Sequence, residues 1–210
     1  NECRKSLDIR LNKKAVRIDT AAKQVEFADG TVENYDNLIS SLPLPEIIKM
    51  ISDVPENVQN AAKQLRWTCG YQVSLGFNRP DVAKYLWFYI YDEDILPARV
   101  YSPNLKSPDN APKGCSSLQA EVFFDCKSKI IPAETVLNNT IEKIKAMNIF
   151  KDEDLIVKDI RFEPYANITF VPSIYKNRQI ILDYLKSQGI DSIGRFGKWD
   201  YKWTHQAFND

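Results

Sequence analysis

The sequence predicts an α+β fold, with a mixed, largely antiparallel sheet and helices packed on one face. Apolar and polar residues alternate with period two over several segments, as half-buried strands require. Asp29-Gly30 lies between two such segments, which is a strong hairpin signal because glycine tolerates positive φ. Apolar residues at helical spacing occur in separate segments, apart from the runs of strands. Together these observations favour α+β over a regular strand–helix alternation.

The period-two segments include one long run, residues 67–77, in which large apolar residues alternate cleanly with small or polar ones. Residues 85–91 are rich in aromatic side chains, which favour strands. Prolines and a glycine mark residues 102–114 as a loop. The predicted strands are residues 7–18, 25–27, 31–32, 35–41, 67–77, 85–91, 100–101, 117–124, 154–162, 165–171 and 190–193.

Helices are predicted where apolar residues recur every three or four positions. Pro45 can open a helix over 46–51, and Pro132 can open another, because proline suits the first helical turn. Gly189 is a suitable residue just after the end of a helix over 175–188. Further helices are expected over 55–65 and from about His205. In the two longest predicted helices, the residues expected to face the protein core are Leu137, Ile141, Ile144, Met147, Ile181, Tyr184 and Leu185.

Charge and composition exclude several classes of protein. The chain has 210 residues, with 28 basic and 28 acidic side chains, so its formal net charge is zero. A nucleic-acid binder or a polybasic membrane binder carries a basic excess, and no apolar run approaches the ~18–20 residues that span a bilayer. No signal-peptide pattern is present at Asn1. We therefore expect a cytoplasmic protein that binds no nucleic acid and spans no membrane.

Cysteine and histidine are too sparse for common catalytic or metal sites. The cysteines Cys3, Cys69, Cys115 and Cys126 form no CxxC pair, so we expect reduced thiols, with a disulfide as the alternative. His205 is the single histidine, which disfavours a catalytic triad or a histidine metal site. It is a candidate general acid or base, and a surface or capping role is the alternative. The sequence assigns no catalytic residue and no metal ligand.

The chain also lacks a phosphate-binding loop of its own. It has seven glycines, and neither GxGxxG nor GxxxxGK[ST] occurs. A nucleotide cofactor would therefore need a binding loop from elsewhere.

Two segments of the chain nevertheless resemble a known family. They are residues 16–45, which include Val25-Glu26-Phe27-Ala28-Asp29-Gly30, and residues 189–206, which include Gly194-Arg195-Phe196-Gly197. Both resemble flavin-containing amine oxidoreductases, a superfamily that includes protoporphyrinogen-oxidase-like enzymes, phytoene desaturases and UDP-galactopyranose mutases. Residues 111–121 and 163–166 fit its bacterial protoporphyrinogen-oxidase-like branch. The resemblance implies the substrate domain plus the C-terminal part of an FAD-linked oxidoreductase.

The resemblance implies FAD contacts at both ends of the chain. In this family the strand around Val16 passes the adenine, and Ser41 and Leu42 follow a strand at the sheet edge where ligands bind. Gly194 allows close approach of the backbone, and Arg195 offers a fork suited to a pyrophosphate. A buried strand valine, a polar strand end and a turn arginine are the ordinary structural alternatives.

The stretch after this turn lies beside the flavin ring in the family. Trp199, Tyr201 and Trp203 alternate, so we expect an extended segment with one aromatic face, in which Trp199 and Tyr201 contact the cofactor. Thr204 is the expected cap of a following helix that points its positive end at the flavin. Packing in a core or an interface is the alternative for the aromatic residues.

The aromatic strands are expected to line a small-molecule site. The candidate substrate-binding residues are Tyr89, Arg99, Tyr101 and Tyr165. Aromatic walls suit sugar rings or flat apolar substrates, and ordinary sheet packing is the alternative. The resemblance names a nucleotide sugar as the candidate substrate, because members of this branch accompany bacterial cell-surface polysaccharide synthesis.

We therefore expect a middle and C-terminal portion of an FAD-dependent oxidoreductase. The expected domains are 1–51, part of the FAD-binding domain; 52–171, the substrate-binding domain; and 172–210, the C-terminal flavin-contacting segment. FAD belongs to the longer parent, and this fragment is expected to bind it weakly or not at all and to be inactive. The alternative function is a non-enzymatic binding module whose aromatic-lined sheet recognises a sugar or a protein. The oligomeric state is not predicted.

Overall fold

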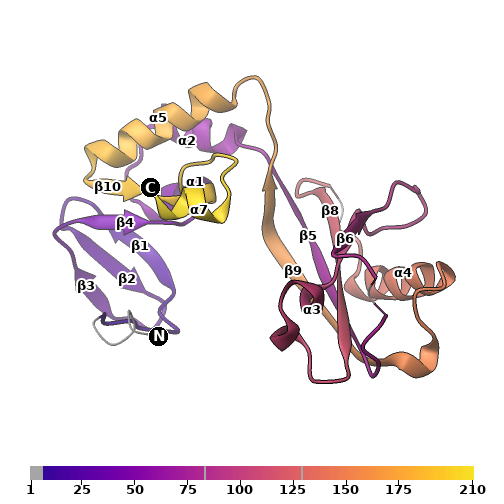
Figure 1. Cartoon of the computed structure of the whole chain (residues 1–210). Coiled ribbons are helices and arrows are strands. Elements are labelled where there is room, and N and C mark those ends of the chain that lie inside the picture. Colours follow the sequence, from indigo (N-terminus) through magenta and orange to yellow (C-terminus); the bar gives the residue numbers. More distant parts are fainter. Residues whose placement is uncertain (1–6, 83, 129) are drawn as a thin grey trace. The chain divides into compact units, whose positions relative to one another are not determined.

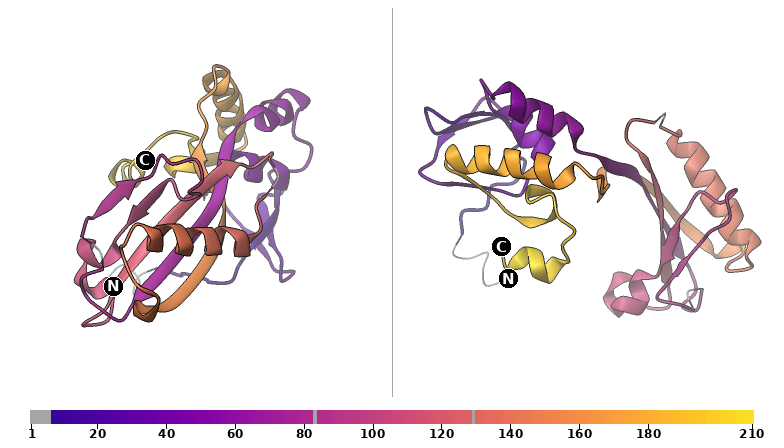
Figure 2. Two further views of the ribbon diagram at one scale, coloured as in Figure 1. Left: turned by 90° about the vertical axis from the view of Figure 1, so that its right-hand side faces the viewer. Right: turned by 90° about the horizontal axis from the view of Figure 1, so that it is seen from above.

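The computed structural model describes residues 7–82, 84–128 and 130–210 (Figure 1). The chain divides into two compact units. One, the split unit, combines the residues up to Arg66 with Ile168–Asp210, and the other, the sheet unit, is Trp67–Asn167. The predicted boundaries at 52 and 172 therefore differ from the structural ones. Residues 52–66 pack in the split unit because α2 (Glu56–Gln64) lies against α5 (Ile174–Ser187), side by side in Figure 2.

The sheet unit is built on five strands in the order β6-β7-β8-β5-β9. Its long central strands are antiparallel, with Leu75 opposite Leu118. One face of the sheet is covered by α4 (Ala133–Ala146), which crosses the strands in Figure 2. The strands are β5 (Trp67–Phe77), β6 (Trp87–Tyr89), β7 (Arg99–Tyr101), β8 (Ser116–Asp125) and β9 (Leu155–Ile168).

Alternation along β5 and β8 explains why only one face is buried. Every second side chain points toward α4 and is buried, and the residues between them are partly accessible. The core on the α4 side contains Tyr71, Val73, Leu75, Phe77, Val100, Leu118, Ala120, Val122, Val136, Ile144 and Phe150. The other face, which we call the open face, carries polar and aromatic side chains. The predicted α+β fold with antiparallel strands and helices on one face is confirmed.

The split unit holds two smaller sheets. An antiparallel sheet, β1-β2-β3, contains the predicted hairpin, in which Gly30 has φ +80° and Phe27 N–H donates to the Thr31 carbonyl at 2.9 Å. A parallel pair joins β4 to β10. The strands are β1 (Ala15–Asp19), β2 (Gln24–Phe27), β3 (Val32–Asn34), β4 (Leu38–Ser40) and β10 (Ile190–Ser192).

The remaining elements are short, apart from the helices already described. The split unit contains α1 (Leu44–Met50), α6 (Gly194–Gly197) and α7 (Thr204–Phe208). The sheet unit contains α3 (Pro103–Lys106), η2 (Pro108–Asn110) and η3 (Asp152–Asp154).

Several predicted elements have different bounds in the structure. Residues 7–14 are not a strand, because they pair with no strand among the described residues, and the strand begins only at Ala15. The two strands predicted over 154–162 and 165–171 are one strand, β9, whose Pro164 is tolerated because β9 lies at the sheet edge. The aromatic strand predicted over 85–91 is limited to Trp87–Tyr89.

The buried stripe of α4 also differs from the prediction. Val136, Thr140 and Ile144 are the fully buried residues, whereas Leu137 and Ile141 are half-buried at the margin. Thr140 is accommodated because its hydroxyl donates to the Val136 carbonyl at 2.7 Å. The predicted core position Met147 lies beyond the end of the helix and is exposed. In α5, Ile181 and Leu185 are buried as predicted, and Tyr184 is half-buried.

Cys69, Cys115 and Cys126 are free thiols, and Cys3 lies outside the described residues. Burial and a hydrogen bond with the Cys69 thiol raise the pKa of Cys126 to about 12. Because alkylation requires the thiolate, we expect iodoacetamide at pH 8 to modify Cys126 roughly a thousandfold more slowly in the native chain than in the chain unfolded in guanidinium. Peptide mass spectrometry over time measures both rates. Equal rates in the two states would contradict the raised pKa.

Candidate functional site

The C-terminal glycine turn of the split unit packs against the end of β4. Strand β10 runs parallel to β4, and Ile193 N–H donates to the Ser40 carbonyl at 2.9 Å. A Cβ at Gly197 would lie 3.0 Å from the Ser40 carbonyl oxygen, so the turn approaches the strand end as closely as glycine allows. The structure therefore brings Ser41 and the Gly194–Gly197 turn together, at the carboxyl ends of two parallel strands, where α/β folds bind ligands.

An anionic group is already held at this turn. Gly194, with φ +76°, donates its N–H to Asp210 Oδ2 at 2.7 Å, and the Lys202 ammonium pairs with the same carboxylate. The hydrogen bond from Lys202, with a smaller contribution from the Gly194 amide, lowers the pKa of Asp210. Because an amide and an ammonium converge on a carboxylate here, the chemistry of this donor set also fits a phosphate.

Arg195 is held over an aromatic ring beside this turn. Its Cζ lies 4.3 Å from the centroid of the Tyr201 ring, which is a cation–π contact. Arg195 is half-buried, and Tyr201 is largely exposed. Arg195 and Tyr201, which were predicted to contact different parts of the cofactor, therefore lie together, with the arginine positioned by the ring.

Trp199 does not share this exposed position. Its side chain is 0% exposed, its φ is +51°, and its ring meets Phe196 edge-on at 6.0 Å. The predicted extended segment with one aromatic face is wrong, because residues 198–200 form a turn that buries Trp199 while Tyr201 and Trp203 stay exposed. The prediction of a flavin contact through the Trp199 side chain is not supported, since this side chain belongs to the core of the split unit.

The helix that follows begins differently from the prediction. Trp203, rather than Thr204, occupies the cap position of α7, and its N–H donates to the side-chain oxygen of Gln206 at 2.8 Å. His205 is exposed on this helix. The helix predicted from about His205 is α7 (Thr204–Phe208), which begins one residue earlier.

The remaining predicted cofactor residues lie at two strands of the split unit. Leu42 donates its N–H to Ser40 Oγ at 3.2 Å just after β4. Val16 lies in β1, where Ala15 pairs with Phe27 and Arg17 pairs with Glu26, so Val16 is the extra residue of a β-bulge. A bulged residue stands outside the regular ladder, which suits the predicted contact through its backbone.

The open face of the sheet unit brings three of the four predicted substrate residues together. Tyr89 is opposite Arg99, and Arg99 is opposite Glu121. Both Arg99 nitrogens Nε and Nη2 donate to Glu121 at 2.7 Å, and this carboxylate raises the pKa of Arg99 above its usual value. A bidentate ion pair therefore fixes the arginine fork on the open face.

Tyr101 lies in the neighbouring row of the same face. Its hydroxyl donates to Gln119 Oε1 and accepts from Gln72 Nε2, the latter at 3.0 Å. Burial raises the pKa of Tyr101, so the hydroxyl stays protonated. Tyr165 lies apart in β9, where its ring stacks on Trp67 at 4.8 Å.

The sequence analysis missed the partners that organise this face. Glu121, Gln119 and Gln72 are polar residues inside long strands, and their alternation with apolar residues was the signal that could have placed them on the face away from the core. The alternation could not show that Glu121 pairs with Arg99, or that Gln119 and Gln72 bond Tyr101.

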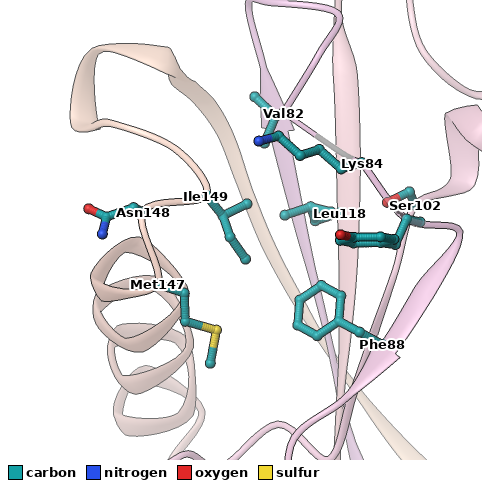
Figure 3. Close-up of a pocket in the computed structure, with 9 residues that line it drawn as sticks. Val82, Lys84, Phe88, Ser102, Leu118, Met147, Asn148 and Ile149 are labelled. Atoms are coloured by element: carbon teal, nitrogen blue, oxygen red, sulfur yellow. Dashed lines mark hydrogen bonds between the residues drawn. The ribbon is translucent and has the colours of Figure 1, made fainter.

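A cavity of about 450 Å³ lies on the α4 side of the sheet (Figure 3). Phe88 and Leu118 from the sheet face Met147 and Ile149, which follow α4, and Lys84 lies at the rim. No predicted site residue lines this cavity. A second, more polar cavity of about 480 Å³ lies beside Tyr101 on the open face.

In the described ranges 7–82, 84–128 and 130–210, no group of three or more His, Cys, Asp or Glu side chains could hold a metal ion. None of the helices in these ranges has the length and apolarity needed to cross a membrane.

The chain combines a parallel strand pair that leads into a glycine turn with a separate antiparallel sheet, as expected for part of an FAD-linked oxidoreductase. Residues 3–189 match the family described as flavin containing amine oxidoreductase, and the chain belongs to this family. The predicted resemblance is confirmed.

Solved structures agree with the family. The chain is similar to reduced UDP-galactopyranose mutase, with a TM-score of 0.83 and 25% identity over 94% of this chain and 43% of the mutase chain. The chain therefore spans less than half the length of that mutase. The fold also matches a candidate protoporphyrinogen oxidase from Exiguobacterium sp. 255-15, with a TM-score of 0.61 and 14% identity over 82% of this chain and 38% of that one.

A third structure, a protein from Pyrococcus furiosus, shares the fold with a TM-score of 0.53 and 13% identity over 88% of this chain and 48% of that one. No curated protein matches the chain in sequence.

Proposed function

We propose that this chain is the substrate-binding and C-terminal flavin-contacting portion of an FAD-dependent enzyme of the amine-oxidoreductase family. The observation that carries the proposal is the Gly194 turn, which meets the end of β4 and holds a carboxylate between a backbone amide and Lys202. An FAD phosphate, like this carboxylate, accepts hydrogen bonds from an amide and an ammonium group. The proposal places residues 1–51 and 172–210 with the flavin and gives the remaining strands to the substrate.

Five described residues are assigned to holding FAD. Gly194 and Arg195 bind its phosphates, and Tyr201 keeps the guanidinium of Arg195 in place. The bulged backbone at Val16 contacts the base, and Ser41 allows the cofactor to approach the end of β4. When bound, the flavin supplies the electron-transfer chemistry, while the protein supplies position and charge.

The open face of the sheet unit is assigned to a small-molecule substrate. Tyr89 offers an exposed aromatic surface, and Arg99 offers a guanidinium whose direction is fixed by Glu121. Together they suit a molecule with a ring and an anionic group. Similarity to a mutase of a nucleotide sugar supports a nucleotide sugar as that molecule and cytoplasmic synthesis of bacterial cell-surface polysaccharide as the setting.

A second candidate is a binding module without chemistry. Trp87 and Tyr89 are each more than half exposed, which favours a binding module, because aromatic faces also bind sugars and proteins without reaction. The coding sequence upstream of Asn1 separates the two candidates. We expect it to encode a strand followed by GxGxxG and an acidic residue ~20 positions later. An upstream sequence without this pattern would favour the binding module.

Arg195→Ala in the full-length gene product is expected to lower FAD occupancy at least about tenfold, since a charge-assisted contact to phosphate is lost. Occupancy is measured as flavin absorbance relative to protein absorbance after gel filtration. The matched control is Arg161→Ala, an exposed arginine on β9, which is expected to keep full occupancy. Unchanged occupancy in Arg195→Ala would remove this residue from the cofactor site.

A further inference from the structure

The polar cavity on the open face lies between the sheet and a short loop. Its volume is about 480 Å³, within the range of small-molecule sites. The floor comes from β5, β7 and β8, and the rim comes from α3 and η2. Its polar lining consists of Ser74, Tyr101, Lys106, Asn110, Ser117 and Gln119.

The floor of this cavity is a fixed row of hydrogen-bonding groups. Gln119 donates from Nε2 to Ser74 Oγ at 3.2 Å and accepts from the Tyr101 hydroxyl. Gln72 Nε2 in turn donates to Tyr101 at 3.0 Å. Because these groups orient one another, the hydroxyl and amide of the row are held in place before any ligand arrives.

Ser117 contributes a hydroxyl that lacks a partner. Its backbone N–H donates to Asn104 Oδ1 at 3.0 Å, which fixes the residue against α3. Its Oγ atom is buried and forms no hydrogen bond within the described part of the chain. Buried hydroxyls are normally paired, so this atom calls for a bound group or a water.

Lys106 contributes a positive charge at the rim that no carboxylate of the described residues pairs with. Lys143 and Lys145, by contrast, are paired with Asp94 and Asp152. Lys106 has no ion pair within 4 Å among residues 7–82, 84–128 and 130–210. The rim that carries it is braced, because Asn110 Nδ2 donates to the Pro103 carbonyl at 3.0 Å.

From these observations we propose that the cavity binds the phosphate-bearing, hydroxyl-rich part of a sugar phosphate. Lys106 pairs with the phosphate, while Ser117, Tyr101 and Gln119 bond the sugar hydroxyls. This proposal rests on the proposed function in one respect, which is that the open face of the sheet unit binds the substrate. It adds a subsite beyond Arg99, toward the α3 end of the sheet.

The test is an NMR titration of the 210-residue chain with glucose 1-phosphate, without flavin. We expect saturable shifts of the backbone amides of Ser117 and Gln119. Lys106→Gln is expected to weaken binding at least about fivefold, because one charge-assisted hydrogen bond is lost. The matched control is Lys113→Gln, an exposed lysine in the following loop that does not line the cavity, and it should leave the affinity unchanged.

Two variants, each titrated with glucose 1-phosphate and with inorganic phosphate, distinguish contacts to the sugar from contacts to the phosphate. Ser117→Ala should weaken glucose 1-phosphate but leave inorganic phosphate unaffected, whereas Lys106→Gln should weaken both. No saturable shift, equal affinity of Lys106→Gln and the unsubstituted chain, or shifts mapped to the cavity beside α4 would each overturn the proposal. Because no flavin is present, these outcomes leave the result for Arg195 untouched, so the two proposals fail separately.

Discussion

Trp199→Ala is expected to lower the free energy of unfolding of the split unit by about 3–5 kcal/mol, the usual range for removing a buried aromatic side chain. Trp199 is the largest fully buried side chain in the described residues. It also holds a left-handed backbone, with φ +51°, which a bulky residue adopts only when its surroundings compel it. Alanine keeps that backbone strain and loses the packing against Phe196.

The matched control is Trp203→Ala, four residues further along the same segment. Trp203 is 65% exposed, so its loss is expected to change stability by less than about 0.5 kcal/mol. Urea unfolding followed by circular dichroism measures both variants, and hydrogen exchange at Ile181 and Leu185 in α5 reports on the split unit by itself. If the two variants were equally stable, the assignment of Trp199 to the core would be wrong.

Gly70→Ala is expected to destabilise the sheet unit by about 3 kcal/mol or more, the upper end of overpacking effects. An added Cβ would lie 2.0 Å from the Val122 carbonyl oxygen and 3.2 Å from Phe123 Cδ1. The first neighbour is backbone within the β5–β8 ladder, which cannot yield without breaking strand pairing. Strand β5 therefore requires glycine at this point for close packing against β8.

Gly76→Ala provides the comparison within the same strand and on the same face. Its Cβ would meet the side chain of Val157 at 3.0 Å, and Val157 is half exposed on the edge strand β9. Because this side chain can move, we expect a loss of less than about 1 kcal/mol. Thermal unfolding measures the midpoints of Gly70→Ala and Gly76→Ala. Similar midpoints would show that the contact at Val122 relaxes without cost.

Local features of the fold were predictable because their causes lie within a few residues. Asp29-Gly30 specified a hairpin, and the structure pairs Glu26 with Val32 across it. Proline and glycine signals located α1 and the end of α5 to within two residues. Alternation in residues 67–77 predicted β5 with the bounds that the structure shows.

Features that depend on a distant partner were not predictable from alternation. Residues 7–11 alternate as strongly as a strand but form none in the described part of the chain. Residues 154–162 and 165–171 were expected to form separate strands, but they belong to one edge strand, in which the missing N–H of Pro164 is not needed. Trp199 and Tyr201 look equivalent in the sequence, yet one is buried and the other is exposed.

The candidate site shows the same division. The sequence by itself determined the α+β class, the hairpin, the resemblance to flavoenzymes and the choice of Arg99, Tyr101, Gly194 and Arg195. Only the tertiary structure decided that Glu121 fixes Arg99, that Tyr201 lies under Arg195, and that Lys106 and Ser117 share a cavity with Tyr101. The reason is physical: turns and strand periodicity arise from backbone sterics and neighbouring residues, whereas ion pairs, burial and cavities depend on register between strands that are distant along the chain.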